Sequence, residues 1–226
     1  MDGPPKIPGA KAVRPRAAAT LLIVRKDGPK PRLLMGRRNS GHNFMPNMWV
    51  FPGGRLDRTD YFAPHATELK PEVAATFERY TTPSRGRALA LAAIRETFEE
   101  AGLLLAKSAP VRPGVKGWRE FLAQGALPDL DAIDIMGRAI TPPMVAKRFD
   151  TWFLLADAER LMSLERQPDC GELDEIAWID ADEAVGLELP MVTRVMVKEV
   201  HERMRDPSRG QPFMRFRHKT AHWGTL

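Results

Sequence analysis

The sequence predicts an α/β fold, because strand-like runs precede a long amphipathic helix. Residues 17–25 are almost wholly apolar and indicate a buried strand, and residues 32–36 form a second strand after a Gly/Pro turn. A short strand is expected at 48–51, directly before a glycine turn. In residues 88–102, apolar side chains recur every three or four positions, which is typical of a helix with one buried face. Strands followed by such a helix indicate the α/β class.

Three glutamates gather on the polar side of this helix. Glu96, Glu99 and Glu100 stand at i, i+3 and i+4, so their carboxylates converge opposite the apolar stripe. Carboxylates this close repel one another, and a positive charge is needed to offset them. Arg95 can orient one of the three, and hard divalent cations, which take oxygen ligands, are the natural partner for the others. Gly102 supplies the left-handed stop that such a helix favours.

The alternative is a solvated helix face without a function, since charged side chains usually lie at protein surfaces. Two observations favour a metal site. No Lys interleaves with the glutamates, as it would in a surface helix rich in ion pairs. Upstream, Phe51-Pro52-Gly53-Gly54 is a tight turn after an apolar run, and its glycines allow backbone carbonyls to approach a ligand.

Together these two segments resemble the Nudix box, the signature of the Nudix hydrolases. The family's pattern is Gly-x5-Glu-x7-Arg-Glu-U-x-Glu-Glu-x-Gly-U, in which U is a bulky aliphatic residue. Gly54 opens the pattern here, and Arg95 through Leu103 close it, with Thr97 at a position that is usually aliphatic. Gly54 and Arg95 are 41 positions apart where the pattern has 14, so about 27 residues are inserted.

The insertion leaves the first Glu of the pattern without a clear counterpart. Asp60 has the right offset from Gly54, whereas Arg87 has the right offset from Arg95. The resemblance implies a Nudix α/β/α sandwich with a mixed central sheet, and the insertion within the Nudix box spans residues 55–87. Its aromatic side chains, among them Tyr61 and Phe62, either form a lid or docking surface beside the site or belong to an elaboration that packs on the outside.

Flanking segments narrow the resemblance to the Nudix branch that includes peroxisomal CoA and acyl-CoA diphosphatases, which also carries a long insertion in the box. The segments that carry this likeness are 33–38, 44–57, 93–102, 140–142 and 148–151. The implied activity is metal-dependent hydrolysis of a diphosphate linkage, in CoA or acyl-CoA, giving 3′,5′-ADP and (acyl)phosphopantetheine. Two alternatives remain: a hydrolase of nucleotide sugars, ADP-ribose or dinucleoside polyphosphates, and a catalytically inactive Nudix fold that binds a ligand or partner.

The resemblance also assigns roles around the metal. Glu96, Glu99 and Glu100 are expected to hold Mg²⁺ or Mn²⁺, and the carbonyl of Gly53 is the additional ligand that the family comparison implies. Arg95 is expected to hold a glutamate of the box in place.

The general base and the residues that bind substrate stay open. Glu99 and Glu172 are both contenders for the base; Glu172 is the first choice in a late acidic loop and Asp174 the second. Arg37, Arg38 and Arg148 lie where they could meet a substrate phosphate, and the alternative for each is a solvated surface charge.

The domain organisation expected is a single elaborated domain. Residues 1–16 are expected as a flexible arm, 17–204 as the Nudix domain, and 205–226 as a basic tail. With 28% charged residues and no apolar run long enough to span a bilayer, no membrane segment is expected.

The expected partner is a small diphosphate substrate. A net charge of +5 suits phosphate-bearing molecules and is too diffuse to indicate nucleic-acid binding. Cys170 is the single cysteine, so no internal disulfide forms, and with no signal peptide visible the chain is expected in the reducing cytoplasm. Many Nudix enzymes are dimers, which makes a homodimer one expected form.

Overall fold

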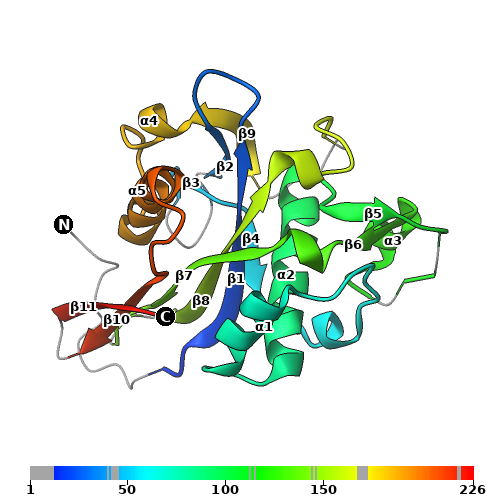
Figure 1. The fold of residues 1–226 in the computed structure, drawn as a ribbon, viewed down its shortest axis with the longest axis horizontal. Coiled ribbons are helices and arrows are strands. Elements are labelled where there is room, and N and C mark those ends of the chain that lie inside the picture. Colours follow the sequence, from blue (N-terminus) through cyan, green and yellow to red (C-terminus); the bar gives the residue numbers. More distant parts are fainter. Residues whose placement is uncertain are drawn as a thin grey trace.

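The protein is built around β1 (Arg16–Arg25), the central strand of a mixed sheet (Figure 1). In this computed structural model, the described residues are 13–39, 41, 46–111, 113–114, 116–143, 145, 147–166, 173–217 and 220–226. Strand β1 pairs in parallel with β8 (Phe149–Asp157) and antiparallel with β2 (Arg32–Arg38). Its apolar run is buried because helices cover both faces of the sheet at this point.

Nine strands of the described chain form the sheet, in the order β11-β10-β7-β8-β1-β2-β3, with β4 paired to β1 and β9 paired to β2. The remaining strands are β3 (Trp49–Val50), β4 (Gly53–Arg55), β7 (Asp134–Ile140), β9 (Leu173–Asp180), β10 (Pro212–Arg217) and β11 (Thr220–Thr225). A separate two-stranded ribbon joins β5 (Ala106–Ser108) to β6 (Ala126–Pro128). The short helices nearby are α3 (Arg119–Ala123), η2 (Leu130–Ala132) and η3 (Ala158–Arg160).

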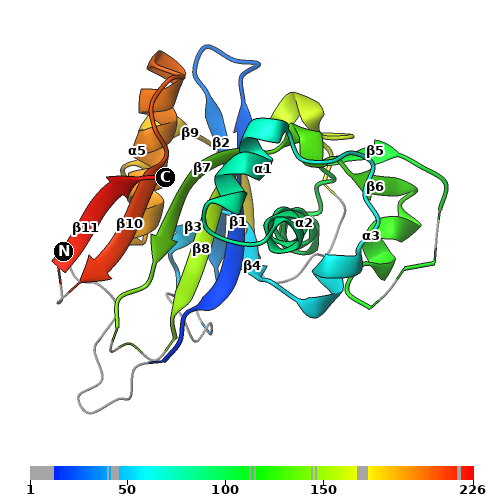
Figure 2. The same cartoon turned by 60° about the horizontal axis from the view of Figure 1, so that its bottom comes forward.

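The alternation of side chains along β1 builds two cores. Leu21 and Ile23 face α2 (Pro83–Ala101), whereas Leu22 and Val24 pack with α4 (Ala181–Ala184) and α5 (Met191–Arg205). Figure 2 shows α2 on one side of the sheet and α5 on the other. The predicted α/β/α sandwich with a mixed central sheet is therefore confirmed.

Helix α2 begins earlier than the sequence suggested. The helical period was identified over residues 88–102, but residues 83–86 already form the first turn of the helix. Proline fits that position because its fixed φ matches the helix and its missing N–H has no partner there. The side chain of Thr82 caps the helix by accepting from the backbone N of Arg85. The predicted stop is confirmed, since Gly102 has a φ of 67°.

The inserted residues form η1 (Arg58–Phe62), α1 (Pro71–Glu78) and the start of α2. Helix α1 belongs to the core: the buried ring of Phe77 lies 4.6 Å from the ring of Trp152. Helix η1 is different, since Tyr61 and Phe62 are exposed. Helix α1 is therefore part of the core, whereas a lid or docking role for the exposed rings of η1 stays a prediction.

The segment expected as a basic tail carries β10 and β11, which extend the sheet beside β7. Its positive charges had suggested a solvated tail, yet Met214 is buried in the core beneath α5. Arg138 links the β10–β11 hairpin to the rest of the fold, because its guanidinium lies 5.0–5.3 Å from the rings of Tyr80, Trp152 and Phe213. The arm expected at 1–16 lies outside the described residues up to position 12. None of the helices described is long and apolar enough to cross a membrane.

Candidate active site

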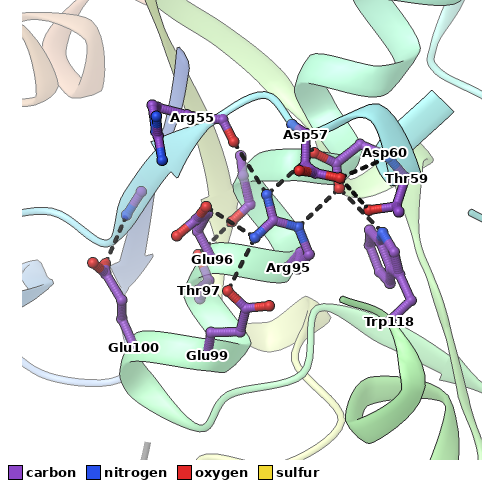
Figure 3. Close-up of polar contacts among 12 residues, drawn as sticks. Arg55, Asp57, Thr59, Asp60, Arg95, Glu96, Thr97, Glu99, Glu100 and Trp118 are labelled. Atoms are coloured by element: carbon purple, nitrogen blue, oxygen red, sulfur yellow. Dashed lines mark hydrogen bonds and ion pairs between the residues drawn. The ribbon is translucent and has the colours of Figure 1, made fainter. Parts of the chain in front are cut away.

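Arg95 is the centre of a polar cluster on α2 (Figure 3). Its Nε and Nη2 donate to Asp60 at 2.8 and 3.1 Å, and its Nη1 donates to Glu96 at 2.9 Å and to Glu99 at 3.0 Å. Nη2 also donates to the carbonyl of Arg55 at 3.2 Å, so every N–H direction of the guanidinium is used. Burial alone would lower the pKa of Arg95, but the surrounding carboxylates outweigh it and raise that pKa.

Asp60 is the one of the two residues at a matching offset for the first Glu of the Nudix box that contacts Arg95. Its side chain is fully buried, and besides Arg95 it accepts from the indole N–H of Trp118 at 3.1 Å and from the backbone N of Asp57 at 2.8 Å. The other residue at a matching offset, Arg87, instead lies 3.5 Å from Glu68. The offset in sequence pointed to Asp60, whereas nothing in the sequence pointed to Trp118.

The glycine turn lies directly against the glutamates of α2. The backbone N of Gly53 donates to Glu100 Oε2 at 2.8 Å. A Cβ on Gly54 would lie 2.3 Å from the carboxyl carbon of Glu96, so this carboxylate keeps its place only while residue 54 has no side chain. Glu96 and Glu100 thus lie against the glycine turn, and Glu99 is linked to Glu96 through Arg95.

The charge in this cluster is unbalanced. Burial, and then repulsion from Glu96, raise the pKa of Glu99 to about 7, although Arg95 acts in the opposite direction. The carboxylates outnumber the guanidinium, and all the donor atoms are oxygens, which is the ligand set that Mg²⁺ and Mn²⁺ prefer. Among the described residues, however, no three acidic, His or Cys side chains are gathered as metal ligands. In this structure Arg95 donates hydrogen bonds to Glu96 and Glu99, while the backbone N of Gly53 donates to Glu100.

The contacts of the basic residues expected at the substrate are structural ones for Arg37 and Arg148, and their role toward substrate stays a prediction. Arg37 forms an exposed ion pair of 3.3 Å with Glu175, between β2 and β9. Arg148 donates to the carbonyls of Thr141 and Val13, and so fastens the start of β8. Arg38, at the end of β2, is half-buried. Within the described residues, Arg37 and Arg148 form their hydrogen bonds and ion pairs with groups other than the glutamates of α2.

The two acids of the late loop are in different situations. Glu172 lies outside the described residues. Asp174 accepts from the side-chain amide of Asn39 at 2.9 Å, near the end of β2. Asp174 therefore has its contact at the end of β2, away from the hydrogen bonds of Arg95.

A cleft of about 890 Å³ opens beside the cluster and is bordered by Arg95 and Glu96. Its other walls come from the start of β1, from the insertion, from the first turn of α2 and from the loop at Lys116 and Gly117. These segments are far apart in the sequence, which is why sequence reasoning did not find the cleft.

The sandwich, the glycine turn and the glutamate-bearing helix define the class of protein. A sequence profile of the NUDIX domain matches residues 14–200. The chain therefore belongs to the Nudix family.

Sequence identity to individual curated relatives is low, at 28% for two of them. The chain is 28% identical over 205 residues to the human Acyl-coenzyme A diphosphatase NUDT19, a match covering 68% of this chain and 54% of that protein. It is 28% identical over 194 residues to Putative nudix hydrolase 7 of Caenorhabditis elegans, covering 75% of this chain and 53% of the relative. The chain thus spans about half the length of these curated relatives. Among solved structures, a NUDIX hydrolase from Alicyclobacillus acidocaldarius matches with a TM-score of 0.59 and 27% identity, covering 82% of this chain and 90% of that one.

Proposed function

We propose that the protein is a divalent-cation-dependent diphosphatase that cleaves CoA or an acyl-CoA into 3′,5′-ADP and (acyl)phosphopantetheine. The observation that carries the hydrolytic part is that Glu96 and Glu100 lie against the glycine turn, while the buried Arg95 donates to both Glu96 and Glu99. The choice of CoA is supported by the similarity to an acyl-coenzyme A diphosphatase.

The glutamates have distinct tasks in this proposal. Glu96, Glu99 and Glu100 hold Mg²⁺ or Mn²⁺, with the Gly53 carbonyl as a further ligand. Such a cation, when bound, supplies charge neutralisation for the diphosphate and acidifies water. Arg95 acts as a positioning residue, because its Nη1 fixes the carboxylates of Glu96 and Glu99 at once.

Hydrolysis needs a group that accepts a proton from water. The water oxygen bonds to one phosphorus, the bridging P–O bond breaks, the leaving phosphate keeps the electron pair and the water proton passes to a base. Glu99 is the base favoured by the described residues, since its side chain is 39% exposed against 15% for Glu96 and can meet solvent. Glu172 remains the other contender.

The test is cleavage of a substrate panel followed by mass spectrometry. The panel holds CoA, acetyl-CoA, ADP-ribose, ADP-glucose and diadenosine tetraphosphate, each with Mg²⁺, with Mn²⁺ and with chelator. Release of 3′,5′-ADP from CoA that stops in chelator is the expected result. Cleavage of another member alone would replace CoA as the substrate, and no cleavage of any would favour the ligand-binding alternative.

Matched variants distinguish the loss of a catalytic group from a general loss of folding. Glu99→Gln and Glu100→Gln should each lower kcat more than about a hundredfold, because even residues that only support metal ligands cost about ten- to a hundredfold. Glu78→Gln, an exposed glutamate at the end of α1, should keep normal activity. Near-normal turnover in both α2 variants, with their folding intact, would remove the glutamates from the mechanism.

A further inference from the structure

The cleft beside Glu96 carries more positive charge than a diphosphate requires. Its lining includes five cationic side chains: Arg16, Arg55, Arg58, Arg85 and Lys116. They come from the start of β1, from β4, from η1, from the first turn of α2 and from the loop before α3, so the fold assembles the cluster from separate segments. All five residues are exposed.

Among the residues described, none of these five side chains forms an ion pair or a hydrogen bond, whereas Arg95, Arg138 and Arg160 are all held by carboxylates. The pKa of Asp57 is lowered mainly by hydrogen bonds from Thr59, and Lys116 interacts with that carboxyl only at longer range, where its charge adds to the lowering. Two acids also line the cleft, and both are engaged: Asp57 caps η1 by accepting from Thr59, and Glu96 accepts from Arg95. Like charges gathered in one cleft without ion pairs of their own attract an anionic ligand.

The position of the cleft connects it to the site. Arg95 and Glu96 form part of its wall, and Arg55, whose side chain lines it, also accepts from Arg95 through its backbone carbonyl (Figure 3). A divalent cation at the glutamates already offsets the charge of a diphosphate diester. The cationic side chains therefore remain available for further negative groups of the same molecule.

We infer that this cleft binds a phosphate group of the substrate other than the scissile diphosphate. The inference rests on the proposed function for the position of the diphosphate. The volume of the cleft, about 890 Å³, lies in the range of small-molecule sites. Exposed Tyr61 in the same wall offers an aromatic surface for the nucleoside that carries the phosphate. The additional phosphate has two chemical sources: a 3′-phosphate on the ribose, as in CoA, or extra phosphates within the bridge of a dinucleoside polyphosphate.

Binding without turnover tests the inference directly. Isothermal titration in chelator compares adenosine 3′,5′-bisphosphate with AMP, and adenosine 5′-tetraphosphate with ADP. The added phosphate, one group in the first pair and two in the second, should tighten binding at low salt by about tenfold or more, as expected for charge-assisted contacts. Preference in the first pair alone assigns the ribose phosphate, and preference in the second pair alone assigns the polyphosphate bridge and removes CoA.

Two double variants decide whether the cleft is responsible. Arg58→Gln with Arg85→Gln should abolish most of the preference for the added phosphate. Lys198→Gln with Arg205→Gln removes the same charge from α5, on the opposite side of the sheet, and should leave the preference intact. Equal binding within both ligand pairs, or a preference that survives in the cleft variant, overturns the inference.

Activity is measured separately, so that the two proposals fail independently. The ratio of kcat/KM for CoA over 3′-dephospho-CoA should fall about tenfold in the cleft variant and stay constant in the α5 variant. If no member of the panel is cleaved but the binding preference and its loss are observed, the proposed function fails and the phosphate site stands.

Discussion

Arg95 and Asp60 form a two-bond ion pair closed to solvent, with side-chain exposures of 7% and 0%. The distances are 2.8 Å for Nε to Oδ1 and 3.1 Å for Nη2 to Oδ2. The pair joins η1, within the insertion, to the helix that carries the glutamates. Since the same guanidinium orients Glu96 and Glu99, the insertion reaches the candidate site through this ion pair and through the carbonyl of Arg55.

Asp60→Asn should therefore weaken both the fold and the site. An amide cannot accept from both guanidinium nitrogens, and the buried Arg95 is left partly uncompensated, which costs about 3–5 kcal/mol. Urea unfolding measures the loss. The control is Asp182→Asn, which breaks an exposed ion pair of 3.0 Å with Lys30 and should cost at most about 1 kcal/mol. Similar losses in the two variants would contradict the role given to the buried pair.

Gly54→Ala should damage the site more than the fold. The added Cβ would lie 2.3 Å from the carboxyl carbon of Glu96, so this side chain must move. We expect activity to fall about ten- to a hundredfold, with a stability loss of about 1–3 kcal/mol from overpacking. Gly224→Ala is the matched control, because a Cβ there meets nothing within 4 Å. Full activity in Gly54→Ala would show that the position of Glu96 is not critical.

The glutamate helix was predictable because its signals are local. The apolar period, the three glutamates and Gly102 all lie within residues 88–102, and each needs only the geometry of one helix. The Gly-Gly turn was predicted for the same reason. The start of the helix was missed, since Pro83 suggests a turn as readily as a first helical position.

Contacts between distant segments could not be predicted in the same way. Trp118 reaches Asp60 across 58 positions, and the cationic cleft gathers side chains that lie in separate segments. The basic C-terminal residues suggested a tail because charge is visible in a sequence, whereas the pairing of β10 with β7 is not.

The C-terminal hairpin gives a prediction of its own. Met214→Ala should destabilise the protein by about 2–5 kcal/mol, because this side chain is buried in the core beneath α5. His222→Ala, an exposed residue on the neighbouring strand, should cost less than about 0.5 kcal/mol. Thermal or urea unfolding compares the two, and equal stability of the two variants would mean that the hairpin contributes little to the fold.

The last prediction concerns the unbalanced charge at Glu99. In chelator, the pKa of this carboxyl is raised from its ordinary value of 4.5 to about 7, mainly by burial. The folded protein then binds this proton more tightly than the unfolded chain does. The associated stability is fully present below pH 4.5 and is lost as the pH rises through about 7.

Glu99→Gln removes this titration, so at pH 8 in chelator the variant should be more stable than the unmodified protein. Solvent screening at a side chain that is 39% exposed limits the gain to about 1 kcal/mol. The difference should vanish near pH 4.5, and Glu78→Gln should follow the unmodified protein at every pH. Mg²⁺ or Mn²⁺ at pH 8 should stabilise the unmodified protein more than the Glu99 variant, because a cation offsets the charge that the variant lacks. A stability difference between the variant and the unmodified protein that does not change with pH would contradict the raised pKa. Equal stabilisation of the two proteins by the cation would show that Glu99 is not one of the cation's ligands.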